Sequence, residues 1–173
     1  NPNNYYNLVR KDIIELALQT GKINSIIDIG CGYGRYLKVI RDNHPNIELV
    51  GTDISKSQIT YAKRYLSDDS IKLIISDSTK LSFDDKYFDL AITYGLFIHI
   101  PPKLFKPIFK EIKRIANKGY FLENDNKEKK INQNHVFTHD YDSIFNKFLI
   151  SKEEIGGDTL YYLNFEKMIK LND

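Results

Sequence analysis

The chain has 173 residues, of which 42% are hydrophobic and 13% aromatic, enough for the core of one globular domain and too few for two ordinary ones. Its net charge of +2 is too small to indicate a nucleic acid or an anionic membrane as partner. The single cysteine, Cys31, excludes an internal disulfide, so a cytoplasmic location is expected. The sequence shows no run of 18 apolar residues and no apolar leader, so neither a membrane span nor a signal peptide is expected.

The first part of the chain alternates between helical and strand-like patterns. Apolar residues at helical spacing from Val9 to Ala17 predict a helix that ends at Gly21. The β-branched run 23–29 predicts a buried strand. Residues 33–43 then predict a second helix, and residues 47–52 predict a second strand.

The same alternation continues through the middle of the chain. The capping box Ser55–Gln58 starts a helix, and the segments 71–75 and 88–93 predict the third and fourth strands. Pro101-Pro102 opens a helix with an apolar stripe, and residues 119–123 predict a fifth strand. Because apolar strands alternate with helices, the sequence predicts an α/β fold whose parallel sheet is covered on both faces.

The C-terminal part departs from this rhythm. A short helix is predicted from Asp140 to Lys147. The segments 148–154 and 159–165 flank Gly156-Gly157-Asp158, which predicts a β-hairpin. The last strand is therefore expected to run antiparallel to the others.

A glycine-rich turn follows the first predicted strand. The segment IIDIGCGYGR places Gly30, Gly32 and Gly34 at alternate positions, with Asp28 two residues before the first glycine. Glycines at the carboxyl end of a parallel strand let a ligand approach the backbone. The spacing differs from the G-x-G-x-x-G of dinucleotide sites. A carboxylate here repels a diphosphate and favours a ligand with an ammonium and a sulfonium group.

These residues resemble the motifs of the class I S-adenosylmethionine-dependent methyltransferases, over residues 24–124. The resemblance implies a single-domain Rossmann-like methyltransferase fold, with a mostly parallel seven-stranded sheet that ends in an antiparallel C-terminal hairpin strand and helices on both faces. It implies S-adenosyl-L-methionine as the cofactor. The whole chain, 1–173, is then one domain: an N-terminal helix or lid (1–22), a cofactor-binding core (23–124), and a substrate-side loop with the hairpin (125–173).

The resemblance also implies the cofactor contacts. The acid and glycine turn holds the methionine part, Asp53 in VGTDIS binds the ribose hydroxyls, and Asp77 in IISDSTKL reaches the adenine amine. Cys31 is interpreted as the filler of a small slot rather than a nucleophile. The expected cofactor-binding residues are Asp28, Gly30, Cys31, Gly32, Gly34, Asp53, Ile54, Ser76, Asp77, Ser78 and Tyr94.

Candidate catalytic residues lie near the predicted ends of strands four and five and in the segments that follow. In HDY, His139 and Asp140 suggest a carboxylate-oriented histidine that takes a proton from a hydroxyl. His99 is the third candidate, at a position that is often structural in related enzymes. His135 and His139 are four residues apart, but no glutamate of H-E-x-x-H accompanies them, so no metal site is predicted. The wider set of substrate-side candidates adds Tyr5, Tyr6, Tyr94, Glu123, Asn124 and Tyr141.

The resemblance implies methyl transfer to a small metabolite, such as a sugar, nucleotide or lipid precursor. The [DNS]-P-P-[YF] motif is missing after strand four, where the chain reads TYGLFIHI, so nucleic acid is not an expected partner. Two alternatives stay open: an inactive cofactor-binding subunit of a larger complex, and a nicotinamide-dependent oxidoreductase. The lysine stripe of the helix after Pro102 is interpreted as a solvated face, with steering of an acidic partner as the alternative; it consists of Lys103, Lys106, Lys110 and Lys113. The acceptor atom, the need for a base and the oligomeric state are not determined by the sequence.

Overall fold

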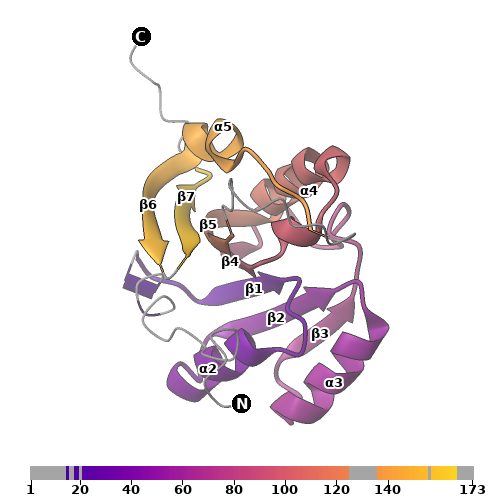
Figure 1. Ribbon diagram of the computed structural model, residues 1–173. Coiled ribbons are helices and arrows are strands. Elements are labelled where there is room, and N and C mark those ends of the chain that lie inside the picture. The colour runs from indigo at the N-terminus through magenta and orange to yellow at the C-terminus, as the bar shows by residue number, and fades with distance from the viewer. Residues whose placement is uncertain (1–14, 16–17, 20, 125–135, 156, 167–173) are drawn as a thin grey trace.

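The computed structural model describes residues 15, 18–19, 21–124, 136–155 and 157–166. A seven-stranded sheet of order β3-β2-β1-β4-β5-β7-β6 crosses the molecule (Figure 1). The strands are β1 (Ser25–Ile29), β2 (Glu48–Asp53), β3 (Lys72–Ile75), β4 (Phe88–Tyr94), β5 (Ala116–Glu123), β6 (Leu149–Ile155) and β7 (Asp158–Asn164). The helices are α2 (Arg35–Asn43), α3 (Lys56–Leu66), η2 (Phe97–His99), α4 (Pro102–Ile115), α5 (Tyr141–Phe145) and η3 (Asn146–Phe148).

Strands β1 to β5 are parallel, and β7 pairs antiparallel with both β5 and β6. The chain order reverses at β1, which has β2 on one side and β4 on the other. In an open α/β sheet this reversal leaves a crevice outside the carboxyl ends of the strands, where ligands bind. The expected mostly parallel seven-stranded sheet with an antiparallel C-terminal strand is confirmed.

Helices cover both faces of the sheet because successive strand residues point to opposite sides. Ile26 packs with α2 and α3, whereas Ile27 packs with α4 and α5. The α4 side is rich in phenylalanine, including Phe97, Phe105 and Phe145, each at most 1% exposed. Since fully buried rings of this size each contribute about 1.5–3 kcal/mol, this layer holds the sheet and the C-terminal helix together.

Some element boundaries differ from the sequence-based expectation. The fifth strand was expected at residues 119–123, but β5 already begins at Ala116, which lies opposite Phe88 of β4. The pairing extends the strand toward α4, because no loop separates the two elements. The expected helix 140–147 is a short α5 followed by η3. The predicted helix from Val9 to Ala17 and the lid 1–22 lie largely outside the described residues.

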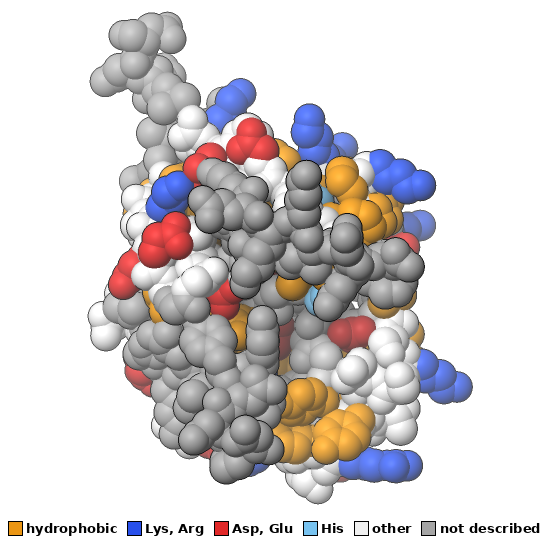
Figure 2. All heavy atoms as spheres, viewed as in Figure 1, with side chains coloured by type: hydrophobic (Ala, Val, Ile, Leu, Met, Phe, Trp, Pro, Cys, Tyr) orange, Lys and Arg blue, Asp and Glu red, His pale blue; other side chains and the backbone are white. Residues whose placement is uncertain are grey.

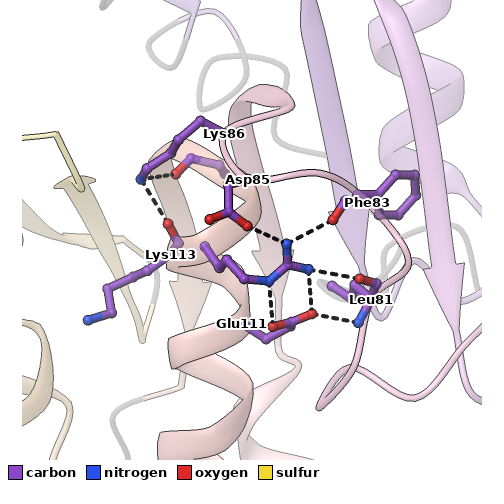
Figure 3. A network of polar contacts seen from close by, with 8 residues as sticks. Leu81, Phe83, Asp85, Lys86, Glu111 and Lys113 are labelled. Atoms are coloured by element: carbon purple, nitrogen blue, oxygen red, sulfur yellow. Dashed lines mark hydrogen bonds and ion pairs between the residues drawn. The ribbon is translucent and has the colours of Figure 1, made fainter.

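Arg114 at the end of α4 fastens the long connection between β3 and β4 (Figure 3). Its guanidinium pairs with Glu111 at 2.8 Å and donates hydrogen bonds to the carbonyls of Leu81 and Phe83 at 2.9 and 2.8 Å. It also contacts the Asp85 carboxylate at 2.7 Å. Since a guanidinium offers five donors in a fixed plane, one side chain orders the whole connection.

No helix among the described residues is long and apolar enough to cross a membrane.

Candidate cofactor and acceptor site

The glycine turn between β1 and α2 is built from backbone that side-chain-bearing residues rarely adopt. Gly30, Gly32 and Gly34 have φ angles of +72°, +54° and +84°. The backbone N–H groups of Gly30 and Cys31 both donate to the Thr52 carbonyl, at 2.8 and 2.9 Å, which ties the turn to β2. The alternate glycines therefore serve the shape of the turn itself.

Only one of the three glycines has room for a Cβ. A Cβ added at Gly30 would lie 2.7 Å from Leu96, and one at Gly34 would lie 2.9 Å from Leu66. At Gly32 the nearest atom is Gln58 Oε1, 3.9 Å away. Gly32 is thus the position where a ligand can approach the backbone, which fits the methionine part of a bound cofactor.

Asp53 lies at the carboxyl end of β2, directly beside this turn. Its Oδ2 accepts a hydrogen bond from Gly32 N at 2.9 Å, and its Oδ1 accepts one from Ser55 N at 2.8 Å. A carboxylate offers about four acceptor positions, so two hydroxyls can still bind to it. The arrangement suits the vicinal hydroxyls of a ribose.

Two exposed apolar side chains lie at the carboxyl ends of β2 and β3. Ile54 is 74% exposed and Ile75 is 51% exposed, although both are large and hydrophobic. Asp77 follows β3; its Oδ1 accepts from Thr79 N at 2.8 Å, and this hydrogen bond lowers the pKa of the carboxyl. An aromatic base would cover the isoleucines and reach Asp77 with its amine. Ser76, whose N–H donates to the Asp53 carbonyl at 3.0 Å, links the two strand ends.

Asp28 and Cys31 lie beneath the turn. Asp28 is 3% exposed; burial, with the charge of Asp53 adding, raises its pKa to about 7, against the influence of Arg35. A buried carboxyl of this kind is stabilised in its charged form by a cation such as an ammonium group. The Cys31 sulfur lies 2.9 Å from the point where a Cβ on Gly51 would be, and burial raises the pKa of the thiol. Cys31 therefore fills a small slot beside the turn and is held as a thiol.

A hollow of about 240 Å³ lies beyond the ends of β4 and β5. Its lining residues are Arg35, Tyr94, Gly95, His99, Leu122, Asn124 and Asp158. The Arg35 guanidinium lies 4.7 Å from the centroid of the Tyr94 ring, and Asn124 Nδ2 donates to Asp158 Oδ1 at 2.9 Å. The hollow thus presents a cation, a carboxylate and an aromatic ring to one small ligand.

Glu123 lies in the chain between two residues that line the hollow, Leu122 and Asn124. Its carboxylate, 0% exposed, accepts from Thr93 Oγ1 at 2.7 Å and from the N–H groups of Leu96 and Phe97 at 3.2 and 3.0 Å. Burial raises its pKa to about 8, although these hydrogen bonds act in the opposite direction. Glu123 therefore fixes the turn after β4, the role of a positioning residue rather than of the substrate contact considered from the sequence.

The structure separates the three catalytic candidates. His139 Nε2 lies 2.8 Å from the Phe97 carbonyl, and its ring stacks on Phe105 with centroids 4.7 Å apart. Asp140 caps α5 by accepting from Ser143 N at 3.1 Å, so the expected orientation of His139 by Asp140 differs from the observed contacts. His99, by contrast, lines the hollow. The candidates Tyr5, Tyr6 and His135 lie outside the described residues.

Four residues of the hollow were missed by sequence reasoning: Arg35, Gly95, Leu122 and Asp158. Asp158 was interpreted as part of the hairpin turn, the usual place for an aspartate between two strands. The pairing of Glu123 with Thr159 across β5 and β7 brings Asp158 beside Asn124. Its carboxyl is 9% exposed, and burial raises its pKa. No pattern within the sequence marks this contact, because the two residues belong to segments more than 30 positions apart.

The chain matches known proteins in sequence and in structure. The family model of the methyltransferase domain covers residues 26–119. The chain is 33% identical over 98 residues to the carboxy-S-adenosyl-L-methionine synthase of Campylobacter hominis, a match that covers 56% of this chain and 42% of that protein. It spans 65% of the length of one curated relative and between 37% and 43% of three others.

Solved structures share the fold. The PH0226 protein from Pyrococcus horikoshii has a TM-score of 0.75 at 23% identity, with 95% of this chain and 93% of that chain covered. A methyltransferase from Haloferax volcanii, solved in complex with a methyltransferase activator, has a TM-score of 0.73 at 19% identity, with 88% of each chain covered. Since the family match spans more than half of the sequence, the chain belongs to the methyltransferase domain family.

Proposed function

We propose that the protein methylates a small polar metabolite, such as a sugar, nucleotide or lipid precursor, bound in the hollow beyond β4 and β5. The observation that carries this proposal is that Arg35 and Asp158 line the same space of about 240 Å³. A pocket of this size suits a small molecule. Its opposite charges suit an acceptor with an anionic group and a hydroxyl or amine donor.

The cofactor, when bound, supplies an electrophilic methyl group on a sulfonium sulfur. We assign its ammonium group to Asp28, its ribose to Asp53 and its adenine to Ile54 and Asp77. Gly32 leaves the backbone open to the methionine part. These residues fit the cofactor because its binding would compensate three unfavourable features of the free protein: a buried acid, two exposed isoleucines and a turn with uncovered backbone.

The acceptor side contributes mainly orientation. Tyr94 lines the hollow, and Glu123 holds the turn after β4. The carboxylate of Asp158 accepts a hydrogen bond from the hydroxyl or amine of the acceptor. Holding the nucleophile near the methyl carbon turns a bimolecular step into a nearly unimolecular one. His99, which lines the same hollow, is our candidate for taking the proton from a hydroxyl acceptor.

The test uses methyl-labelled S-adenosylmethionine and a cell extract divided into small molecules, RNA and protein. The wild type is expected to label a small molecule that gains one methylene unit in mass. Asp158→Asn should lower this labelling at least tenfold and leave the affinity for S-adenosylhomocysteine unchanged. Asp142→Asn is the matched control, because Asp142 pairs with Lys152 at 3.0 Å outside the hollow. Label in the RNA or protein fraction would refute the small-molecule acceptor.

A second candidate is a cofactor-binding subunit that needs a partner. One observation favours it: a fold neighbour was solved in complex with a methyltransferase activator. This candidate would be established if the chain alone binds S-adenosylhomocysteine but labels no fraction, and if adding a co-purified protein restores the labelling. The nicotinamide-dependent alternative is set aside by the family membership.

A further inference from the structure

A second concave surface lies between α4 and the α5–η3 segment. This groove has a volume of about 450 Å³ and shares no lining residue with the acceptor hollow. Its floor is apolar and consists of Phe109, Ile144 and Phe148. Its rim is basic and consists of Lys106, Lys110, Lys113 and Lys147. Figure 2 shows Lys and Arg side chains standing out over α4.

The rim lysines lack carboxylate partners within ion-pair distance among the described residues. The acids that belong to these helices are engaged elsewhere: Glu111 pairs with Arg114 at 2.8 Å, and Asp142 pairs with Lys152 at 3.0 Å. Lysines three and four positions apart share one side of α4 and extend over roughly 10 Å of it. The groove is therefore lined by several like charges that nothing in the described structure neutralises.

Lys113 shows that this charge is held close to the apolar floor. Its Nζ lies 4.3 Å from the centroid of the Phe148 ring and 5.2 Å from that of Phe109. Burial, together with the neighbouring charge of Lys110, lowers the pKa of Lys113. A solvated helix face would leave each ammonium group in water. Here an incoming carboxylate would offset both the cost of burying the Lys113 ammonium group and its repulsion from Lys110.

We infer that this groove docks an acidic amphipathic segment of another protein. Apolar side chains of such a helix fit against the partly buried Ile144 and Phe148, while its flanking Asp and Glu side chains meet the lysine rim. A nucleic acid makes poorer use of the site because stacking of a base needs a free ring face: Phe109 is 4% exposed, and the Lys113 ammonium lies 4.3 Å from the centroid of Phe148.

The segments of this chain that the structure does not describe are a poorer match to the groove than a segment of another protein. The segments 1–14, 125–135 and 167–173, which the structure does not describe, each contain more Lys and Arg than Asp and Glu. None of them supplies the acid-rich face that the groove requires. Because the groove is separate from the acceptor hollow, a docked partner leaves the hollow accessible.

The experiment titrates the full ¹⁵N-labelled chain with a synthetic helix of about 16 residues, long enough to be partly helical, with Leu along one face and Glu on both flanks. A peptide with Gln in place of Glu and an oligouridine of equal formal charge are the comparisons. The Glu peptide is expected to shift the amide signals of Lys106, Lys110, Ser143 and Lys147, with an affinity that falls as salt is added.

Variants make the result decisive. The double change Lys106→Glu with Lys110→Glu should weaken the Glu peptide at least tenfold, and Ile144→Ser should weaken it severalfold. Lys63→Glu on α3 changes the charge of another exposed surface and should have no effect. Absence of groove shifts, equal binding of the Gln peptide, equal loss with Lys63→Glu, or tighter binding of oligouridine at the same residues would each overturn the inference.

Discussion

The carboxylate of Asp53 accepts a 2.9 Å hydrogen bond from the backbone N–H of Gly32, across the adjacent ends of β2 and β1. One side chain thereby holds the glycine turn in shape and faces the space assigned to the ribose. The proposed binding of the ribose to Asp53 would therefore couple cofactor affinity to the conformation of the turn.

Replacing Asp53 by Ala should therefore lower both the affinity for the cofactor and the stability of the fold. Loss of two charge-assisted hydrogen bonds to the ribose, at about 1.5–3 kcal/mol each, lowers the affinity for S-adenosylhomocysteine at least ~100-fold. Because Gly32 and Ser55 also lose their acceptor, the melting temperature should fall as well. Calorimetric titration and thermal unfolding measure the two effects. Asp42→Ala, which removes an exposed partner of Lys38, is the control, and an equal affinity of both variants would contradict the assignment of Asp53.

Gly32 and Gly51 offer a matched pair of glycine substitutions. Gly32→Val leaves room for a Cβ, 3.9 Å from Gln58 Oε1, but it forces a β-branched residue to φ +54°, so binding should be lost together with part of the stability. Gly51→Ala places a Cβ 2.6 Å from Leu37, so stability should fall while the folded fraction still binds. Circular dichroism and titration with S-adenosylhomocysteine separate the two outcomes. Unchanged binding by Gly32→Val would show that the turn does not contact the ligand.

The raised pKa of Asp28 makes the stability of the free protein depend on pH. The folded carboxyl keeps its proton up to a pH of about 7, whereas the unfolded one releases it near 3.8. Between these values the folded state binds more protons, so the contribution of Asp28 to stability is full below pH 3.8 and is lost as the pH rises to about 7. One proton corresponds to a slope of at most about 1.4 kcal/mol per pH unit.

Asp28→Asn should abolish this slope, which urea unfolding at several pH values measures. Glu123 contributes in the same sense, with a pKa of about 8, and stays present in both proteins as the internal reference. If the difference in unfolding free energy between Asp28→Asn and the wild type stays constant across this range, Asp28 does not titrate as its burial implies.

Cofactor binding should release a proton from Asp28. An ammonium group beside the carboxylate favours its charged form, so near pH 6 the bound protein holds less of this proton than the free protein. Titrations with S-adenosylhomocysteine in buffers of different ionisation enthalpy measure the proton count. The release should vanish in Asp28→Asn, and an unchanged release there would assign the proton to another group.

The two histidines should separate catalysis from stability. His99→Ala should lower kcat on a hydroxyl acceptor by roughly 10²-fold and leave cofactor affinity intact, because His99 lines the hollow. His139→Ala removes the contact with the Phe97 carbonyl and the stacking on Phe105, so it should cost about 1–2 kcal/mol of stability. The reverse outcome, a loss of kcat in His139→Ala alone, would restore His139 as the base suggested by the HDY motif.

Much of the core was predictable because its signals are local. The alternation of apolar strands and helices depends on neighbouring residues, and the capping role of Ser55 is confirmed by its 3.3 Å hydrogen bond from Gln58 N. The glycine turn was predictable for the same reason, since positive φ angles at Gly30 and Gly34 demand glycine whatever surrounds them. The boundary at Ala116 was not, because the strand pairing with Phe88 overrides the helical pattern.

The sequence by itself determined the class of fold, the family and the spacing of Asp28, Asp53 and Asp77, each at or near the carboxyl end of one of three successive strands. These features survive without tertiary information because each is set by short-range geometry. Only the tertiary structure placed Asp158 beside Asn124, committed Glu123 to the turn after β4, and turned a lysine stripe into the rim of a groove. Such contacts join residues of different elements, and their burial and charge are set by packing that no single segment contains.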